Sequence, residues 1–225
     1  MEKRPLLYEE VIENLYRLID SGKIKPGETF PSERVLIGEW DISRNVLREA
    51  FHILEQRGLI TSRQGKGRFL RKLPDDQHRD MSESTSKMIE RCSLLEIYQV
   101  RQMLEAKACG LTALRITDSD VNELEKCYQK VAEQFRQNGT TKGEFEIHKM
   151  YLEKCGNEYL KQLCEMARQQ VRDMMSSSFR EVLGEHDPEE TLMAHRMIID
   201  AISKHNMEKA EKLMAAHIQK TIDML

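Results

Sequence analysis

The sequence of 225 residues has no apolar run approaching the roughly 18–20 residues that a membrane-spanning helix needs. Its N-terminus lacks the short apolar stretch and small-residue cleavage site of a secretory signal. The five cysteines are odd in number and form no CxxC pair, which predicts reduced, mostly buried thiols. These absences argue against a membrane protein or a secreted protein and favour a cytoplasmic location.

Charge is unevenly distributed along the chain. The net charge is −3, but residues 1–73 carry 14 Lys/Arg against 11 Asp/Glu, so the acidic excess lies behind them. From Arg57 to Lys72 there are six basic residues and no acidic one. This asymmetry predicts a front end that binds nucleic acid and a back end of a different kind.

Three helices are predicted in the first sixty residues by the spacing of apolar side chains, at about 6–20, 33–40 and 44–57. Ser32 and Ser43 are typical N-caps for the second and third helices, and Gly58 is a typical C-terminal stop. Asp41 suits the tight turn between them, because aspartate tolerates left-handed backbone geometry. Two short helices joined in this way predict a helix-turn-helix.

The second helix of this motif has a polar face suited to reading DNA. Arg44 and Arg48 are one turn apart on that face, with Asn45 beside them, and these side chains can hydrogen-bond guanine and adenine edges. The following LITSRQGKGRFL predicts a wing hairpin, in which Gly65–Lys66–Gly67 approaches the phosphate backbone. The alternative is an ordinary solvated surface, but caps, turn, basic face and wing occur together and in order.

The segments KIKPGETFPSERVL, ISRNVLREAFHILEQRGLI and SRQGKGRFL resemble the winged helix-turn-helix of GntR-superfamily transcription regulators. The match covers about residues 8–71. The resemblance implies DNA contacts from an arginine that begins the first motif helix, two arginines on the recognition helix, and the glycine-containing wing tip. In this sequence those positions are Arg34, Arg44, Arg48 and Gly65–Lys66–Gly67.

Beyond a polar linker, the sequence has no strand-like alternation. We therefore expect three parts: a winged helix-turn-helix at 1–72, a linker at 73–84, and an all-helical domain at 85–225. Amphipathic spacing predicts helices at about 82–91, 94–115, 118–137, 143–155, 157–183, 188–204 and 206–224. The expected fold is mainly α, with six or seven helices in an α bundle behind the winged domain.

Polar residues lie on the apolar faces of several of these helices, namely Arg101, Glu144, His148, His195 and His217. Glu144 and His148 are four residues apart, so both side chains point to one place. A single inward histidine is more often a satisfied core residue, and that alternative stays open. Buried polar groups are costly unless partnered, however, and one shared metal ion satisfies three histidines and a carboxylate together.

The segments YQVRQMLEAKACGLTALR, EFEIH and HRMIIDAISKHNMEKAEKLMAAH resemble the FCD ligand-binding domain of FadR-like regulators. In that domain an aspartate, a histidine four residues later and two further histidines bind a divalent metal. The resemblance implies the ligands Glu144, His148, His195 and His217, with glutamate in place of the usual aspartate. Arg101 matches an arginine that holds an effector carboxylate near the metal.

The sequence thus predicts a homodimeric transcription regulator, expected to be a repressor, that binds double-stranded DNA at a palindromic operator. Residues 85–225 are expected to dimerise and to bind a small carboxylate effector. Three histidines and one carboxylate fit zinc, nickel, iron or manganese. Two alternatives use the same residues: a metal-dependent enzyme with open coordination positions, and an architectural DNA-binding protein with a structural metal. No acid–base or nucleophile pattern beside the histidines favours the enzyme.

Overall fold

The structure, a computed structural model, describes residues 7–72, 84–138, 144–174 and 188–225. The chain forms two compact units, Met1–Leu94 and Leu95–Leu225. Helix α4, Thr85–Arg115, contributes its first ten residues to the first unit and the remainder to the second. The linker predicted at 73–84 lies outside the described residues except for Ser84.

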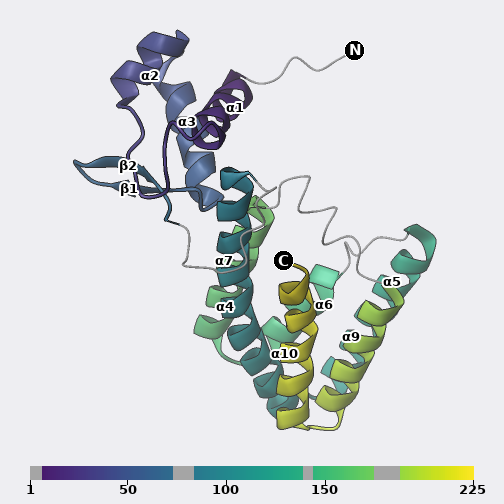
Figure 1. Cartoon of the computed structure of the whole chain (residues 1–225). Helices are drawn as coiled ribbons and strands as arrows, with labels where there is room; N and C mark the ends of the chain where they lie inside the picture. Colours follow the sequence, from purple (N-terminus) through teal and green to yellow (C-terminus); the bar gives the residue numbers. More distant parts are fainter. Residues whose placement is uncertain (1–6, 73–83, 139–143, 175–187) are drawn as a thin grey trace. The chain divides into compact units, whose positions relative to one another are not determined.

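The first unit is a helix-turn-helix followed by a two-stranded hairpin (Figure 1). Its elements before α4 are α1 Leu7–Asp20, α2 Glu33–Trp40, α3 Arg44–Gln56, β1 Ile60–Arg63 and β2 Gly67–Leu70. Ser32 and Ser43 cap α2 and α3, each accepting a hydrogen bond from the backbone N–H three residues later. Asp41 ends α2 with φ +50°, the left-handed geometry predicted for the turn.

Strands β1 and β2 pair antiparallel, with Ile60 opposite Leu70 and Arg63 opposite Gly67. Backbone pairing also joins β2 to the segment before α2, where Phe30 N donates to Arg68 O at 2.8 Å. The hairpin is therefore fixed by backbone hydrogen bonds to the segment that leads into α2. Buried side chains from all of these elements form one core, including Leu15, Leu36, Leu47, Phe51, Leu54, Leu59 and Leu70.

The first residues of α4 pack against α1 and against the residues that flank the β1–β2 hairpin. Arg71 donates to the Ser93 hydroxyl at 2.6 Å, and that hydroxyl donates to Gly58 O at 3.3 Å. Tyr16 of α1 donates to the Glu90 carboxylate. The predicted break between helices at 82–91 and 94–115 was wrong: Cys92 and Ser93 are buried inside one continuous helix, and neither is a residue that stops a helix.

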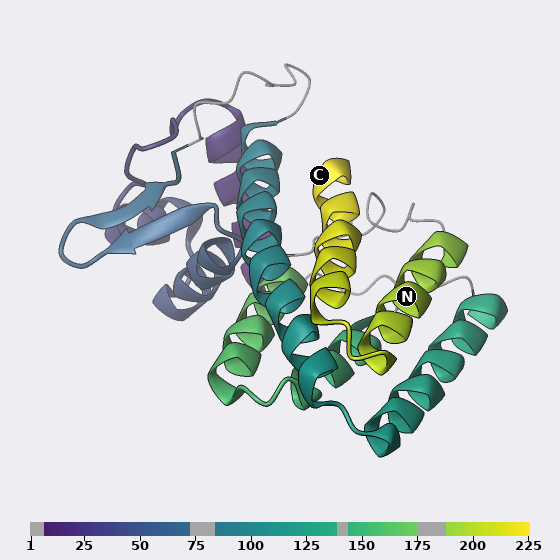
Figure 2. The same cartoon turned by 90° about the horizontal axis from the view of Figure 1, so that it is seen from below.

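The second unit is all helical in its described residues. After α4 its helices are α5 Asp118–Asn138, α6 Glu144–Lys154, α7 Glu158–Met174, α9 Pro188–Ser203 and α10 Met207–Met224. Figures 1 and 2 agree that α10 lies between α4 and α9, while α5 lies on the other side of α9. This fold confirms the predicted winged helix-turn-helix followed by an α-helical bundle.

One predicted helix is only partly described. The helix expected at 157–183 is seen as α7 to Met174, and residues 175–187 lie outside the described part of the chain. All five cysteines are free thiols, and four of them are buried, as expected for reduced cysteines. Among the described helices, none combines the length and the apolar character needed to cross a bilayer.

Candidate nucleic-acid interface and metal centre

Helix α3 separates its apolar and polar residues onto opposite sides. Leu47, Ala50, Phe51 and Leu54 are buried in the core of the first unit. The predicted DNA-reading residues Arg44, Asn45 and Arg48 are all exposed. The Ser43 cap places the N-terminal turn of α3 so that these side chains face away from the core. The arrangement suits an α-helix that enters the major groove.

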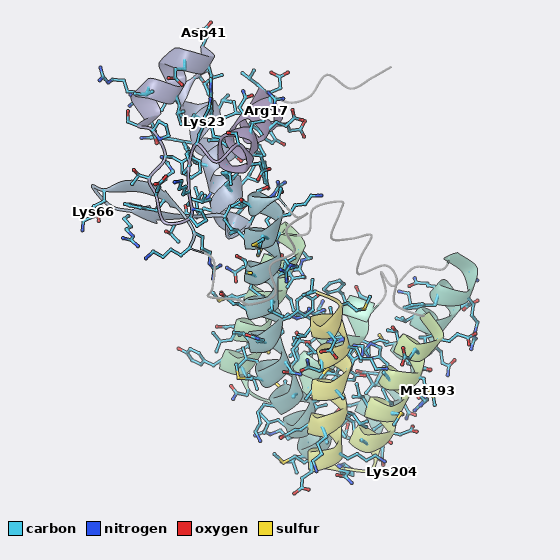
Figure 3. The ribbon with its side chains drawn as sticks, viewed as in Figure 1. Arg17, Lys23, Asp41, Lys66, Met193 and Lys204 are labelled. Carbon is cyan, nitrogen blue, oxygen red and sulfur yellow. The ribbon has the colours of Figure 1, made fainter. Side chains whose placement is uncertain are left out.

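The wing presents its predicted residues at the tip of the β1–β2 hairpin, where Figure 3 labels Lys66. Gly65 and Gly67 have φ values of +71° and +100°, so their glycine identity is required by backbone conformation. Both glycines and Lys66 are exposed, as is Arg34 on α2. Each predicted DNA contact is therefore accessible at the surface of the first unit.

Arg48 has a partner within the first unit that the sequence did not suggest. Its Nε donates to the Glu33 carboxylate at 3.2 Å, and Arg68 of β2 donates to the same carboxylate at 2.7 Å. Burial alone would raise the Glu33 pKa, but the two arginines together hold that pKa below its usual range. Glu33 thus connects the recognition helix to the wing.

The structure brings together three of the predicted metal ligands, one from each of three helices. His148 lies on α6, His195 on α9 and His217 on α10, and all three are buried. One nitrogen of each lies within 4.8 Å of the others. Nε2 of His148 and Nε2 of His217 are 3.3 Å apart, and the rings of His195 and His217 have centroids 4.5 Å apart.

Glu105 of α4, which the sequence reasoning missed, connects this cluster to Arg101. Its Oε2 lies 2.6 Å from His148 Nδ1, and its Oε1 accepts from Arg101 Nε at 2.6 Å. Glu105 is 1% exposed and Arg101 is 5% exposed. Burial alone would raise the Glu105 pKa, but Arg101 and His148 hold that pKa well below its usual range.

A signal for Glu105 was present in the sequence. Glu105 follows Arg101 by four residues on one helix, the same spacing that identified Glu144 and His148. Tyr151 was also missed: its hydroxyl lies 3.4 Å from His195 Nδ1. Glu144 begins α6, but its side chain lies outside the described part of the structure.

The geometry of the three histidines suits a metal ion. When His148 donates its Nδ1 proton to Glu105, its Nε2 carries the lone pair that a metal requires. Two nitrogens that are each about 2.1 Å from one tetrahedral ion would be about 3.4 Å apart. The observed separation of 3.3 Å between His148 and His217 nitrogens is close to this value. The residues present therefore fit a divalent cation.

Two family models match the chain, each within one of the sequence regions described above. Residues 7–70 match the gntR family of bacterial regulatory proteins, and residues 96–220 match the FCD domain. The first range holds the helix-turn-helix and the wing. The second holds Arg101, Glu105 and the three histidines.

Among curated relatives, the chain is 24% identical over 212 residues to the HTH-type transcriptional regulator LutR of Bacillus subtilis, covering 92% of this chain and 96% of LutR. It is 33% identical over 135 residues to the Glc operon transcriptional activator of Escherichia coli, covering 58% and 50% of the two chains. It is 25% identical over 215 residues to the Uxu operon regulator of Haemophilus influenzae, covering 94% and 79%.

Solved structures show the same fold. Lar, described as controlling expression of the Listeria monocytogenes agr system, aligns with a TM-score of 0.62 at 17% identity, covering 99% of this chain and 98% of Lar. A GntR protein of Streptococcus agalactiae aligns with a TM-score of 0.51 at 24% identity, covering 97% and 100%. These relatives are regulators and not enzymes, and the chain belongs to the GntR family of bacterial transcription regulators, with an FCD domain behind its helix-turn-helix.

Proposed function

We propose that this regulator binds a palindromic operator as a homodimer and that a small carboxylate, bound at a metal centre in the helical domain, controls that binding. The observation that carries the proposal is the buried convergence of His148, His195 and His217, with Glu105 and Arg101 behind them. One nitrogen from each imidazole lies within 4.8 Å of the others, which is close enough for all three to bind one divalent cation.

His148, His195 and His217 would hold the metal, with Glu144 as a fourth ligand one helical turn before His148. Zinc, nickel, iron and manganese all accept this set of nitrogen and oxygen ligands. A cation that accepts five or six ligands would keep one or two coordination positions for an effector carboxylate beside these four. Glu105 orients His148 and binds the Nε of Arg101, so the guanidinium of Arg101 lies on the same carboxylate as the first metal ligand and would pair with an effector carboxylate. Arg101 would therefore select for an effector that carries a carboxylate.

On the DNA side, Arg44, Asn45 and Arg48 read base edges in the major groove, while Arg34 and Gly65–Lys66–Gly67 contact the backbone. All are exposed in the first unit, which supports these roles. A dimer would place two such helices in successive grooves, so the operator is expected to be palindromic. We propose dimerisation through residues 85–225 and repression relieved by the effector. One relative is named an activator, so the sign of regulation is a separate measurement.

The proposal is tested by metal analysis combined with thermal unfolding. The full chain is reconstituted with Zn²⁺, Ni²⁺ or Mn²⁺, and a panel of small carboxylates is added to each form. We expect about one metal per chain, and a carboxylate at about 100 times its Kd should stabilise the loaded protein by about 2.7 kcal/mol. The same carboxylate should leave the chelated protein unchanged.

The matched variants are His148→Ala combined with His195→Ala, and His52→Ala as a control histidine that is exposed on α3. The double variant should lose both the metal and the carboxylate response, while the control keeps both. If the reconstituted wild-type chain holds no metal, or if the double variant binds as much metal as wild type, the histidines are core residues and the proposal is wrong.

A further inference from the structure

The contacts of Glu33 go beyond what a carboxylate at the start of a helix requires. It is the first residue of α2, where a carboxylate interacts favourably with the helix dipole. That role needs no contact beyond α2. Instead its side chain reaches two other elements and binds Arg48 of α3 and Arg68 of β2. A residue that only begins a helix would remain in solvent, whereas the Glu33 side chain is 23% exposed.

Arg68 is held firmly on one side of this carboxylate. Its guanidinium binds Glu33 at 2.7 Å and stacks over the ring of Phe51 at 4.4 Å. Phe51 is a buried core residue of α3. Because the Phe51 ring and the β2 backbone both fix Arg68, Arg68 in turn fixes where the Glu33 carboxylate lies.

Arg48 is held differently, because among the described residues only its Nε makes a hydrogen bond. Its Nε lies 3.2 and 3.3 Å from the two Glu33 oxygens. Its side chain is 57% exposed, and among the described residues its two terminal nitrogens have no hydrogen-bond partner. The nitrogens that make a bidentate contact with guanine therefore face solvent, while Glu33 restricts the guanidinium to one orientation.

We propose that Glu33 is a positioning residue for DNA recognition, which orients Arg48 for base contact without touching DNA itself. The inference rests on the proposed role of Arg48 and adds a residue that the sequence reasoning did not select. For substitution of Glu33, the proposal predicts a loss of affinity for the specific duplex, whereas charge alone predicts a gain. Removing an acidic charge beside DNA strengthens binding to phosphates, whereas freeing Arg48 weakens sequence-specific binding.

The fold should survive substitution of Glu33. The hairpin keeps its backbone pairing to the segment before α2, and Ser32 still caps that helix. Glu33→Gln removes the charge at constant shape. Glu33→Asp keeps the charge but shortens the side chain by one methylene, so that it no longer reaches both arginines. Glu39→Gln is the control, because Glu39 is an exposed acid on the same helix that makes no hydrogen bond or ion pair with the described residues.

The test uses the full chain and a duplex that the wild-type chain selects from a random-sequence pool. Affinities for that duplex and for a scrambled duplex are measured by fluorescence anisotropy at several salt concentrations. Glu33→Gln and Glu33→Asp should each bind the selected duplex about tenfold more weakly. Binding of the scrambled duplex should be unchanged for Glu33→Asp and unchanged or tighter for Glu33→Gln. Glu39→Gln should keep wild-type discrimination.

A second comparison shows whether the effect acts through Arg48. In an Arg48→Ala background, Glu33→Gln should cause no further loss of affinity for the selected duplex. The proposal is overturned if Glu33→Gln alone keeps or exceeds wild-type affinity and discrimination, or if its loss is the same without Arg48. A wild-type chain that selects no consensus would instead overturn sequence-specific DNA binding itself, and the role of Glu33 with it.

Discussion

Glu105 joins two buried side chains, Arg101 and His148, at 2.6 Å from each. It compensates the charge of Arg101 in the protein interior, where an uncompensated charge is costly. It also fixes the ring orientation of His148, so that Nε2 rather than Nδ1 faces His217. Both effects depend on one carboxylate, which makes Glu105 the most informative single position in the helical domain.

Replacing Glu105 with glutamine should therefore weaken both folding and metal binding. Loss of the charge removes the ion pair between Glu105 and the buried Arg101, and we expect a decrease of about 3 kcal/mol in the free energy of unfolding. Metal affinity should fall about 10- to 100-fold, because His148 is oriented less strictly. Denaturant unfolding of the metal-free chain and calorimetric metal titration measure the two effects separately. Glu146→Gln, an exposed acid on α6, is the control. Unchanged stability and metal affinity in Glu105→Gln would contradict this role.

Among single residues, the sequence identified those whose type was unusual for their position. Each histidine of the cluster stood out as a polar residue on an apolar helical face. Glu105 and Glu33 were not selected, because acidic residues are common on helices and, apart from Arg101 four residues before Glu105, their partners are distant in the sequence. Glu105 lies 43 residues from His148, and Glu33 lies 35 residues from Arg68. Only the folded arrangement shows these contacts.

Helices α5 and α6 are linked by a small polar network at the start of α5. Asp120 accepts from the Thr117 backbone N–H at 3.0 Å, while its own backbone N–H donates to the Thr117 hydroxyl at 3.2 Å, which together form a capping box. Lys154, at the end of α6, donates to the Asp120 carboxylate at 2.5 Å. The network thus holds the helix that carries His148 against its neighbour.

This network predicts a pH dependence of stability. The hydrogen bonds from Lys154 and Thr117 lower the pKa of Asp120 from 3.8 to about 2. A lowered pKa means that the stabilisation is present above the ordinary pKa and is lost as the pH falls toward 2. Asp120→Asn should cost about 1 kcal/mol at neutral pH. Unfolding measured across pH should show this difference from wild type shrinking below pH 4.

Asp118→Asn is the control for that experiment. Asp118 lies in the same first turn of α5, and among the described residues it takes no part in the network. A difference between Asp120→Asn and wild type that stays constant down to pH 2 would show that the ionised carboxylate is not the source of the stabilisation.

Element prediction succeeded where a local signal marked a boundary. Ser32, Ser43 and Gly58 marked the ends of the motif helices, and the structure places those ends there. A break near Cys92 was predicted from amphipathic spacing alone, with no glycine or proline to support it. The spacing changes because α4 passes from one set of neighbours to another, burying Glu90 and Ser93 against the winged helix.

The molecule consists of two units, a helix-turn-helix with its wing and a helical domain with the histidine cluster. The charge difference between the two parts of the sequence predicted such a division. Helix α4 belongs to both units: Ser93 binds the winged helix, and Arg101 and Glu105 lie eight and twelve residues further along the same helix. The sequence predicted the family and the order of domains, which the matches over 7–70 and 96–220 confirm. It carries no comparable signal for the identity of effector or operator, because those depend on side-chain geometry in the bound state.

The central claim is that a carboxylate controls DNA binding through the three-histidine centre. The most direct test measures operator affinity of the full chain with and without metal and the carboxylate found by thermal shift. In the metal-loaded wild type, that carboxylate should change operator affinity by about 5- to 150-fold. It should have no effect after chelation or in the chain with both His148→Ala and His195→Ala. An equal change in operator affinity in the chelated protein and in that double variant would contradict the claim.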